Sequence, residues 1–192
     1  DDLLKATAIA SANDACFALG EYVAGSDTAF VKMMNDRAKE LGMNDTVFEN
    51  CSGLDDTVQN HITSAYDVAV MSRELLKHER IRNYTTVWMD TLRGGETQLV
   101  NTNKLIRFYK GATGLKTGTT SKAGCCVSAT AERDGLSLIA VVMGSESSND
   151  RFSGARAMLD WGFANYSLAE LSVDPALITD VNVIGGEQDK IS

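Results

Sequence analysis

The stretch from Gly111 to Ser121 reads Gly-Ala-Thr-Gly-Leu-Lys-Thr-Gly-Thr-Thr-Ser, and it sets one lysine among glycines and hydroxyl residues. Apolar runs follow at once, so we expect Lys116 to lie on a strand at the edge of a sheet. Gly118 has no side chain, so a ligand backbone could approach that strand closely. Lys116 would supply positive charge, and Thr117 and Thr119 would supply hydroxyl donors, for a substrate carrying a carboxylate. The alternative is a surface loop rich in Gly and Thr, because three-residue matches often arise by chance.

The chain beyond this stretch predicts a hairpin and a helix. Residues 124–132 and 136–144 are apolar runs that turn at Arg133-Asp134-Gly135, where Asp-Gly is the hairpin signal. Residues 138–143 are nearly all apolar, so we expect that strand to be buried on both faces. Residues 149–165 predict a long helix. Its apolar side holds Phe152, Ala155, Leu159 and Phe163.

The chain before the central stretch predicts mostly helices. Residues 3–10 suit a short helix or loop, and Ser11 could cap the helix that follows. Residues 28–41 have helical spacing, and Gly42 is a stop signal. We expect the methionines of this helix in the core. Its apolar residues are Phe30, Met33, Met34, Ala38 and Leu41.

A further helix begins after a long loop. Ser64 suits its N-cap, with Asp67 three residues on as a shortened capping box. We expect a buried face made of Ala65, Val68, Met71, Leu75 and Leu76. Residues 83–100 predict short strands that turn at residues 93–95.

Composition excludes several classes of protein. The 192 residues allow one domain or one and a part, and 44% apolar residues support a real core. The net charge of −8 and the lack of a basic cluster argue against nucleic-acid binding. No apolar run is long enough to span a bilayer, and the first residues do not form a signal peptide.

Cysteines and histidines give little sign of a metal site. No Cys-x-x-Cys pair occurs and there are only two histidines, so zinc is not expected. We expect all four cysteines to be reduced packing residues, although spacing alone does not assign disulfides. We expect both histidines to be loop or cap residues. The cysteines are Cys16, Cys51, Cys125 and Cys126, and the histidines are His61 and His78.

A second motif gives the lysine a context. Ser11-Ala12-Asn13 is a Ser-x-Asn, and Ser-x-Asn followed far downstream by Lys-Thr-Gly resembles the signature of penicillin-binding proteins and serine β-lactamases. From about Ser11 to Tyr166 the chain resembles the low-molecular-weight D-alanyl-D-alanine carboxypeptidases of bacterial cell walls. The similar segments are residues 23–26, 30–35, 41–43, 46–50, 52–55, 61–67, 101–105, 151–152 and 159–163.

The resemblance implies an α/β (α+β) fold, an antiparallel sheet with helices on both faces. Residues 1–166 would be part of a penicillin-binding catalytic domain. Residues 167–192 would be a linker and the first strands of a C-terminal β domain. Residues 51–54 read Cys-Ser-Gly-Leu where most relatives have Pro-His-Gly-Leu, so this position has no histidine to take that residue's part.

The resemblance also implies a two-step acyl transfer through a serine. Ser11 would relay a proton to the leaving amine, Asn13 would orient the substrate and the lysine base, and Lys116 would add positive potential. Thr117 and Thr119 would bind the substrate's terminal carboxylate beside Gly118, and the backbone N–H of Thr119 would form half of the oxyanion hole. Arg151 matches a family arginine that faces the same carboxylate; the alternative is a solvated charge at a helix start.

One part of the signature is missing. No serine of the chain has lysine three residues later, so the family's nucleophilic Ser-x-x-Lys does not occur. We therefore expect a fragment that is inactive alone and has an uncovered core groove. Two alternatives stay open: a β-lactamase, although no Glu-x-x-x-Asn supports it, and a non-catalytic module that binds wall peptide or a partner.

The resemblance suggests partners and a location. The ligands would be peptidoglycan stem peptides ending in D-Ala-D-Ala, and β-lactams that mimic them. The missing N-terminal segment would be a partner within the same protein. No metal or organic cofactor is implied. The protein would be exported and act at the outer face of the cytoplasmic membrane, in cell-wall synthesis and cell shape.

Overall fold

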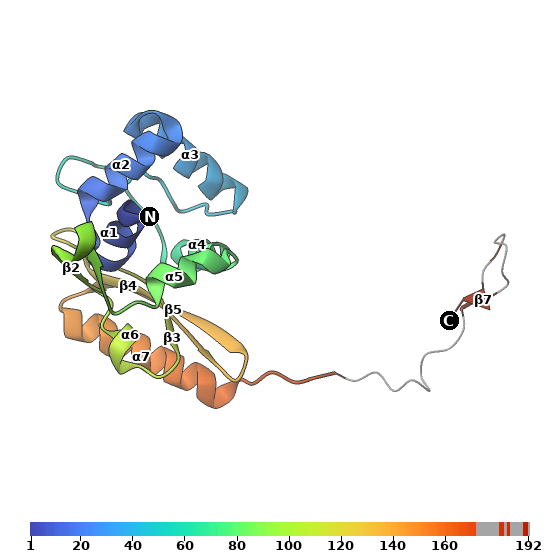
Figure 1. Ribbon diagram of the computed structural model, residues 1–192. Helices are drawn as coiled ribbons and strands as arrows, with labels where there is room; N and C mark the ends of the chain where they lie inside the picture. The colour runs from blue at the N-terminus through green and yellow to red at the C-terminus, as the bar shows by residue number, and fades with distance from the viewer. Residues whose placement is uncertain (172–180, 183, 185–189, 192) are drawn as a thin grey trace.

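The structure is a computed structural model that describes residues 1–171, 181–182, 184 and 190–191. Its first part is helical (Figure 1). The elements in order are α1 Asp2–Ala10, α2 Asn13–Ala24, α3 Asp27–Glu40, α4 Ala65–Leu76, the 3-10 turn Glu79–Ile81 and α5 Arg82–Thr85. The helices predicted from residues 28–41 and from the Ser64 cap are confirmed, and the residues before Ser11 form a helix.

The second part carries the strands and the longest helix. The elements in order are β1 Met89–Leu92, the 3-10 turn Arg93–Gly95, β2 Thr97–Val100, α6 Leu105–Phe108, β3 Ala112–Thr120, β4 Gly124–Arg133, β5 Leu136–Ser145, α7 Ser148–Asn165, β6 Val181–Asn182 and β7 Lys190–Ile191. The predicted strands within residues 83–100, the hairpin and the long helix are all confirmed.

Three antiparallel strands form the main sheet in the order β3-β4-β5. Lys116 pairs with Ser128, and Thr130 pairs with Ile139. The β4–β5 turn needs positive φ at two residues, 50° at Asp134 and 79° at Gly135, which is why Asp-Gly suits it. Among the described strands β3 pairs with β4 alone, so the lysine of the central stretch lies on an edge strand, as predicted.

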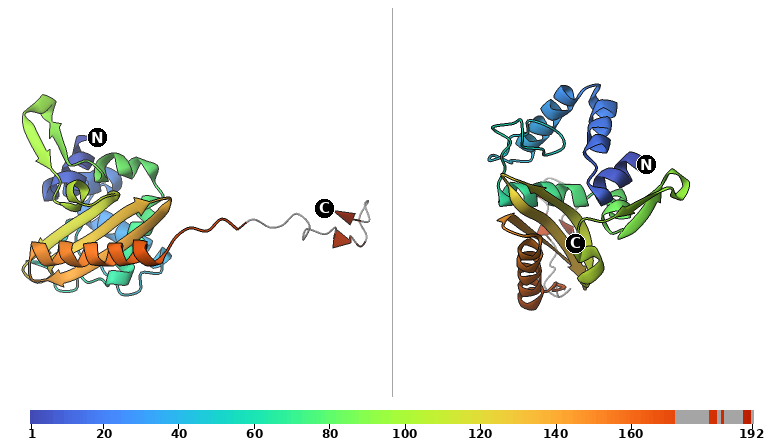
Figure 2. Two further views of the ribbon diagram at one scale, coloured as in Figure 1. Left: turned by 90° about the horizontal axis from the view of Figure 1, so that it is seen from below. Right: turned by 90° about the vertical axis from the view of Figure 1, so that its left-hand side faces the viewer.

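Helix α7 covers one face of the sheet and completes a close-packed core (Figure 2). Gly162 permits the close approach, since a Cβ there would lie 2.6 Å from Cδ1 of Leu138. The buried residues of this core are Leu105, Tyr109, Val127, Ala129, Ala131, Ala140, Phe152, Ala155 and Leu159. The face predicted for α7 is therefore confirmed, with Phe163 packed at its margin.

Helix α4 covers the opposite face less completely. A buried hydroxyl pair, Ser72 and Ser128 at 2.7 Å, joins α4 to the sheet. The prediction of a fully buried apolar face on α4 is wrong, because Ala65 is exposed and Met71 and Leu75 are each 37% exposed. Residues 138–143 of β5 were predicted to be buried on both faces of the sheet. That prediction is also wrong, because β5 is partly exposed on the side that faces α4.

An apolar groove of about 440 Å³ runs between α4 and the sheet. Its walls carry hydrophobic side chains from both elements, and few polar groups interrupt them. The apolar lining is Val68, Met71, Leu75, Leu115, Val127, Val141, Val142 and Met143. The predicted uncovered groove is therefore present on the α4 side of the sheet.

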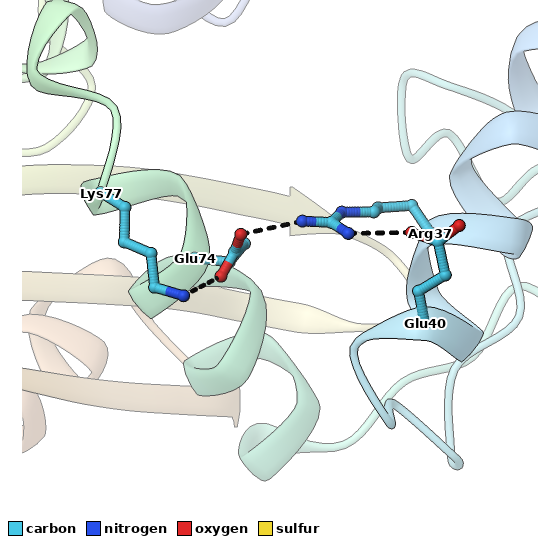
Figure 3. A network of polar contacts seen from close by, with 4 residues as sticks. All are labelled: Arg37, Glu40, Glu74 and Lys77. Carbon is cyan, nitrogen blue, oxygen red and sulfur yellow. Dashed lines mark hydrogen bonds and ion pairs between the residues drawn. The ribbon is translucent and has the colours of Figure 1, made fainter. Parts of the chain in front are cut away.

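Helix α2 packs against both α1 and α3, and α1 also contacts α5, β1 and β2. Ser26 caps α3 by accepting from the amide of Ala29 at 3.2 Å. The prediction that the α3 methionines are core is wrong for Met33, which is 49% exposed, because the helix buries Ala38 instead. Arg37 of α3 bridges to Glu74 of α4, within a network of surface charges (Figure 3).

Helix α7 ends at Asn165, next to the predicted domain boundary. Most of residues 167–192 lie outside the described residues, so the predicted C-terminal domain stays a prediction. Within the described part, β6 and β7 pair antiparallel, with Val181 opposite Ile191. None of the helices that the structure describes is both long and apolar enough to cross a bilayer.

Candidate active site

Ser11 lies in the tight junction between α1 and α2. It is the C-cap of α1 and adopts a left-handed conformation with φ 60° and ψ 39°. Such values are uncommon for a residue with a Cβ, and they often mark functional positions. The expectation that Ser11 caps the following helix is wrong, because Ala12 holds that position. Its hydroxyl is therefore free to point away from both helices.

That hydroxyl meets the central lysine. Nζ of Lys116 donates to Oγ of Ser11 at 2.6 Å and to the carbonyl oxygen of Thr117 at 2.7 Å. Burial first, and then the charge of Arg151, lower the pKa of Lys116 to about 8. Two motifs that are 105 residues apart in the chain thus share one hydrogen bond.

Thr117 and Thr119 lie on the opposite face of β3 from Lys116, because side chains alternate along a strand. Thr117 is buried, and its hydroxyl donates to Oγ1 of Thr102 at 2.7 Å. Gly118 and Thr119 are exposed, and nothing lies within 4 Å of where a Cβ of Gly118 would stand. The edge of β3 at Gly118 and Thr119 is therefore open to a ligand.

Arg151 is buried at the start of α7, only 7% exposed, so the alternative of a solvated surface charge is excluded. Its Nη1 donates to the carbonyl oxygen of Gly118 at 2.9 Å and to Oγ1 of Thr119 at 2.9 Å. It also donates to the carbonyl oxygen of Cys126 at 3.3 Å. Arg151 thus lies behind β3 and supports it, and it is not among the residues that line the cleft in front.

Ser11, Asn13 and Lys116 line one cleft of about 530 Å³. Asn13 opens α2 and is exposed to the cleft beside Ser11. The lining is Thr7, Ser11, Ala12, Asn13, Cys16, Cys51, Ser52, Gly53, Leu54, Lys116, Thr117, Gly118, Thr119 and Thr120. The structure therefore brings Ser11, Asn13 and the Lys-Thr-Gly strand to one hollow, with the residues after Cys51 as the facing wall.

Two groups were missed by sequence reasoning. Thr102 holds Thr117 through its hydroxyl, and its amide donates to the carbonyl oxygen of Ile9 at 3.1 Å, near the end of α1. Asn103 is almost fully buried and donates to the carbonyl oxygen of Gly114 at 2.8 Å. Two asparagines flanking a threonine just before the central stretch were the available signal.

The four cysteines are free and half-buried, as expected for reduced packing residues. Two of them, Cys16 and Cys51, lie in the cleft wall, which sequence spacing did not indicate. Among the described residues, no group of three His, Cys, Asp or Glu side chains is arranged to hold a metal ion.

The fold and the site define a class, the penicillin-binding proteins. Penicillin-Binding Protein D2 from Listeria monocytogenes in the Ampicillin bound form superimposes with a TM-score of 0.78 at 36% identity, covering 84% of this chain and 66% of that one. Penicillin binding protein 6B from Escherichia coli matches with a TM-score of 0.79 at 35% identity, covering 99% of this chain and 56% of that one. The α/β fold with an antiparallel sheet between helices is thereby confirmed.

Sequence comparison narrows the class to a family. Residues 1–147 match the family D-alanyl-D-alanine carboxypeptidase, and the chain belongs to that family. It is 43% identical to D-alanyl-D-alanine carboxypeptidase DacF of Bacillus subtilis over 190 residues, which cover 97% of this chain and 48% of that protein. It is 37% identical to DacD of Salmonella typhimurium, over 100% of this chain and 48% of that one. The chain thus spans about half the length of these curated relatives.

Proposed function

We propose that this chain is the proton-relay and carboxylate-binding part of a serine D-Ala-D-Ala carboxypeptidase. The observation that carries the proposal is the 2.6 Å hydrogen bond between Lys116 and Ser11 inside a cleft bordered by an open strand edge. The enzyme would remove the terminal D-alanine from a peptidoglycan stem peptide through an acyl-enzyme.

Ser11 and Lys116 would move the proton. A protonated Lys116 that donates to Oγ of Ser11 leaves the hydroxyl proton of Ser11 free to pass to the leaving amine. The same positive charge favours the alkoxide character that Ser11 gains during that transfer. Asn13, exposed at the start of α2, would hold the acyl side of the substrate.

The open edge of β3 would bind the other end of the peptide. Arg151 donates to Oγ1 of Thr119, and this hydroxyl donates to Sγ of Cys125 at 3.9 Å, a long contact that the substrate's terminal carboxylate would replace. The Thr117 hydroxyl already donates to Thr102, so its part would be to fix the strand. The backbone amide of Thr119 would form half of the oxyanion hole, a donor whose loss costs roughly 10²–10³-fold in rate.

We further propose that a Ser-x-x-Lys segment outside these 192 residues supplies the nucleophile and its base. No serine here has lysine at the third position after it. The apolar groove between α4 and the sheet supports the proposal, because a segment packed there would cover Met71, Leu75 and Met143. Burying such apolar surface contributes about 25 cal/mol per Å².

Three smaller proposals follow from the same assignment. The longer protein would bind β-lactams, since the Listeria protein to which this chain is similar is described in an ampicillin-bound form. It would be exported to the bacterial envelope, where stem peptides are found. It would contribute to cell shape by trimming them.

The test compares two proteins with a fluorescent penicillin and with a peptide ending in D-Ala-D-Ala. The longer protein that includes an upstream Ser-x-x-Lys should be labelled covalently and should release D-alanine. The 192-residue chain should do neither. Asn13→Ala should slow both reactions in the longer protein, with Asn44→Ala, an exposed asparagine outside the cleft, as the matched control.

Each result has a distinct meaning. Labelling of the 192-residue chain would contradict a nucleophile outside it. A longer protein that binds the peptide but neither becomes labelled nor releases D-alanine would be a non-catalytic binding module. Faster turnover of penicillin than of the peptide would indicate a β-lactamase.

A further inference from the structure

Two thiols meet in the wall of the cleft although neither serves the proposed acyl transfer. Cys16 lies on α2, three residues after Asn13, and Cys51 lies in the loop before α4. The Cys16 thiol donates to the carbonyl oxygen of Cys51 at 2.9 Å, across 35 positions of sequence. Both residues are half-buried and both line the cleft.

The separation suits a disulfide. A carbonyl oxygen lies about 2.4 Å from the Cα of its own residue, so Sγ of Cys16 lies within about 5.3 Å of Cα of Cys51. Bridged cysteines have Cα atoms about 4.4–6.8 Å apart and sulfurs about 2.05 Å apart. The Cys16 sulfur thus already contacts the backbone of Cys51, and a change of rotamer at Cys51 together with a small shift of the loop before α4 would bring the two sulfurs together.

The surroundings of the pair keep both sulfurs in the thiol form. Burial first, and then the Asp27 carboxylate and the Cys16 thiol, raise the pKa of Cys51 to about 12. Burial also raises the pKa of Cys16, while its contact with Cys51 and the charge of Lys116 act against the rise. Both thiols are thus protonated at neutral pH, and they react through the small fraction that is ionised.

We propose that Cys16 and Cys51 form a dithiol site that a small-molecule disulfide oxidises to a protein disulfide. Cys16 loses its proton to solvent, and its thiolate attacks the reagent R–S–S–R, forms a mixed disulfide and releases one thiolate RS⁻. Cys51 then loses its proton to solvent, and its sulfur attacks the Cys16 sulfur and expels the second RS⁻. Two electrons pass to the reagent, and the two thiol protons leave on two molecules of RSH.

The bond would join two walls of the cleft. Cys16 belongs to the helix that begins with Asn13, and Cys51 precedes Ser52 in the facing wall. Oxidation would hold these walls at one separation, whereas in the reduced pair a thiol–carbonyl hydrogen bond links them.

The test uses the 192-residue chain and does not depend on the proposed function. The reduced protein is incubated with oxidised glutathione and then examined by intact mass and by mapping of cross-linked peptides. We expect a mass lower by two hydrogens and a cross-link between the peptides that contain Cys16 and Cys51. An unchanged mass, stable glutathione adducts alone, or a cross-link through Cys125 or Cys126 would overturn the proposal.

Matched variants separate this pair from the other two cysteines. Cys16→Ser or Cys51→Ser should abolish the loss of two hydrogens, and the double change Cys125→Ser and Cys126→Ser should leave it intact. In urea the preference for the 16–51 cross-link should vanish, since the native fold is what brings these thiols together. A preference that persists in urea would contradict the structural argument.

Discussion

The two faces of the β3-β4-β5 sheet differ in how completely they are covered. Toward α7, Ala129 and Ala155 are fully buried and Leu159 is 1% exposed. Toward α4, Met71 and Leu75 are each 37% exposed beside a groove of about 440 Å³. The α7 face is therefore a closed hydrophobic core, whereas the α4 face leaves apolar side chains exposed to solvent.

The difference follows from the chain order. Strands β4 and β5 and helix α7 are consecutive, so a short length of chain folds back on itself and closes the α7 face. The α4 face is built from segments far apart in sequence, and its apolar groups exceed what α4 alone covers. The site lies at the edge strand β3, where the two faces meet.

The largest expected difference between the α7 and α4 faces is the loss of stability when one leucine on each face is replaced by alanine. Leu159→Ala should lower the free energy of unfolding of the 192-residue chain by about 2–5 kcal/mol, because it opens a cavity in a closed core. Leu75→Ala should cost less than about 1.5 kcal/mol, because its side chain already contacts solvent. Urea denaturation followed by circular dichroism measures both.

The same pair tests the proposed cover of the groove. In the longer protein the cost of Leu75→Ala should rise toward that of Leu159→Ala. Equal costs for the two variants in the 192-residue chain would contradict the contrast between the faces.

Removal of the lysine at the edge between the faces should affect chemistry more than stability. Lys116→Ala in the longer protein should slow acylation by a fluorescent penicillin by roughly 10²–10³-fold, since it removes a preorganised donor and charge. Lys39→Ala, an exposed lysine of α3, is the control and should leave the rate unchanged. A normal rate in Lys116→Ala would exclude its proposed part in the relay.

The lowered pKa of Lys116 predicts a smaller effect: as pH rises, stability should increase and the acylation rate should decrease. Folding lowers the pKa from 10.5 to about 8, so between these values the unfolded chain binds more protons and stability rises with pH. Acylation in the longer protein should fall as pH rises through about 8, where the folded protein's Lys116 loses its charge. Lys116→Met should remove the rise in stability with pH. Lys116→Arg should shift the fall in acylation rate to higher pH, because arginine keeps its charge. Parallel changes in stability and rate would contradict this assignment.

The surface ion pairs between α3 and α4 should contribute least to the free energy of unfolding. Arg37 contacts Glu40 and Glu74, and Lys77 contacts Glu74, all near solvent (Figure 3). Exposed ion pairs are screened and gain little over hydration. Arg37→Ala should leave the urea midpoint unchanged within error at both low and high salt. A clear loss of stability would show that α3 and α4 are held by charge and not by packing.

Local sequence signals predicted most of the helices and strands. They also pointed to Ser11 and Lys116, which share a hydrogen bond in the site. The Asp-Gly turn, the Ser64 cap and the apolar spacing of α7 act within a few residues, so they could be found without the fold. Burial could not be predicted in the same way. Met33, Met71 and Leu75 have apolar side chains at helical spacing, but only the packing partner decides whether such a side chain is covered.

The sequence alone determined the family motifs, the hairpin and the edge position of Lys116, because each depends on neighbours in the chain. Only the tertiary structure decided that Ser11 ends one helix instead of starting the next, that Arg151 supports β3 from behind, and that Thr102 holds Thr117. It also decided that Cys16 and Cys51 meet. These contacts join segments many residues apart, and their geometry follows from how helices and sheet pack, which no local pattern of residues encodes.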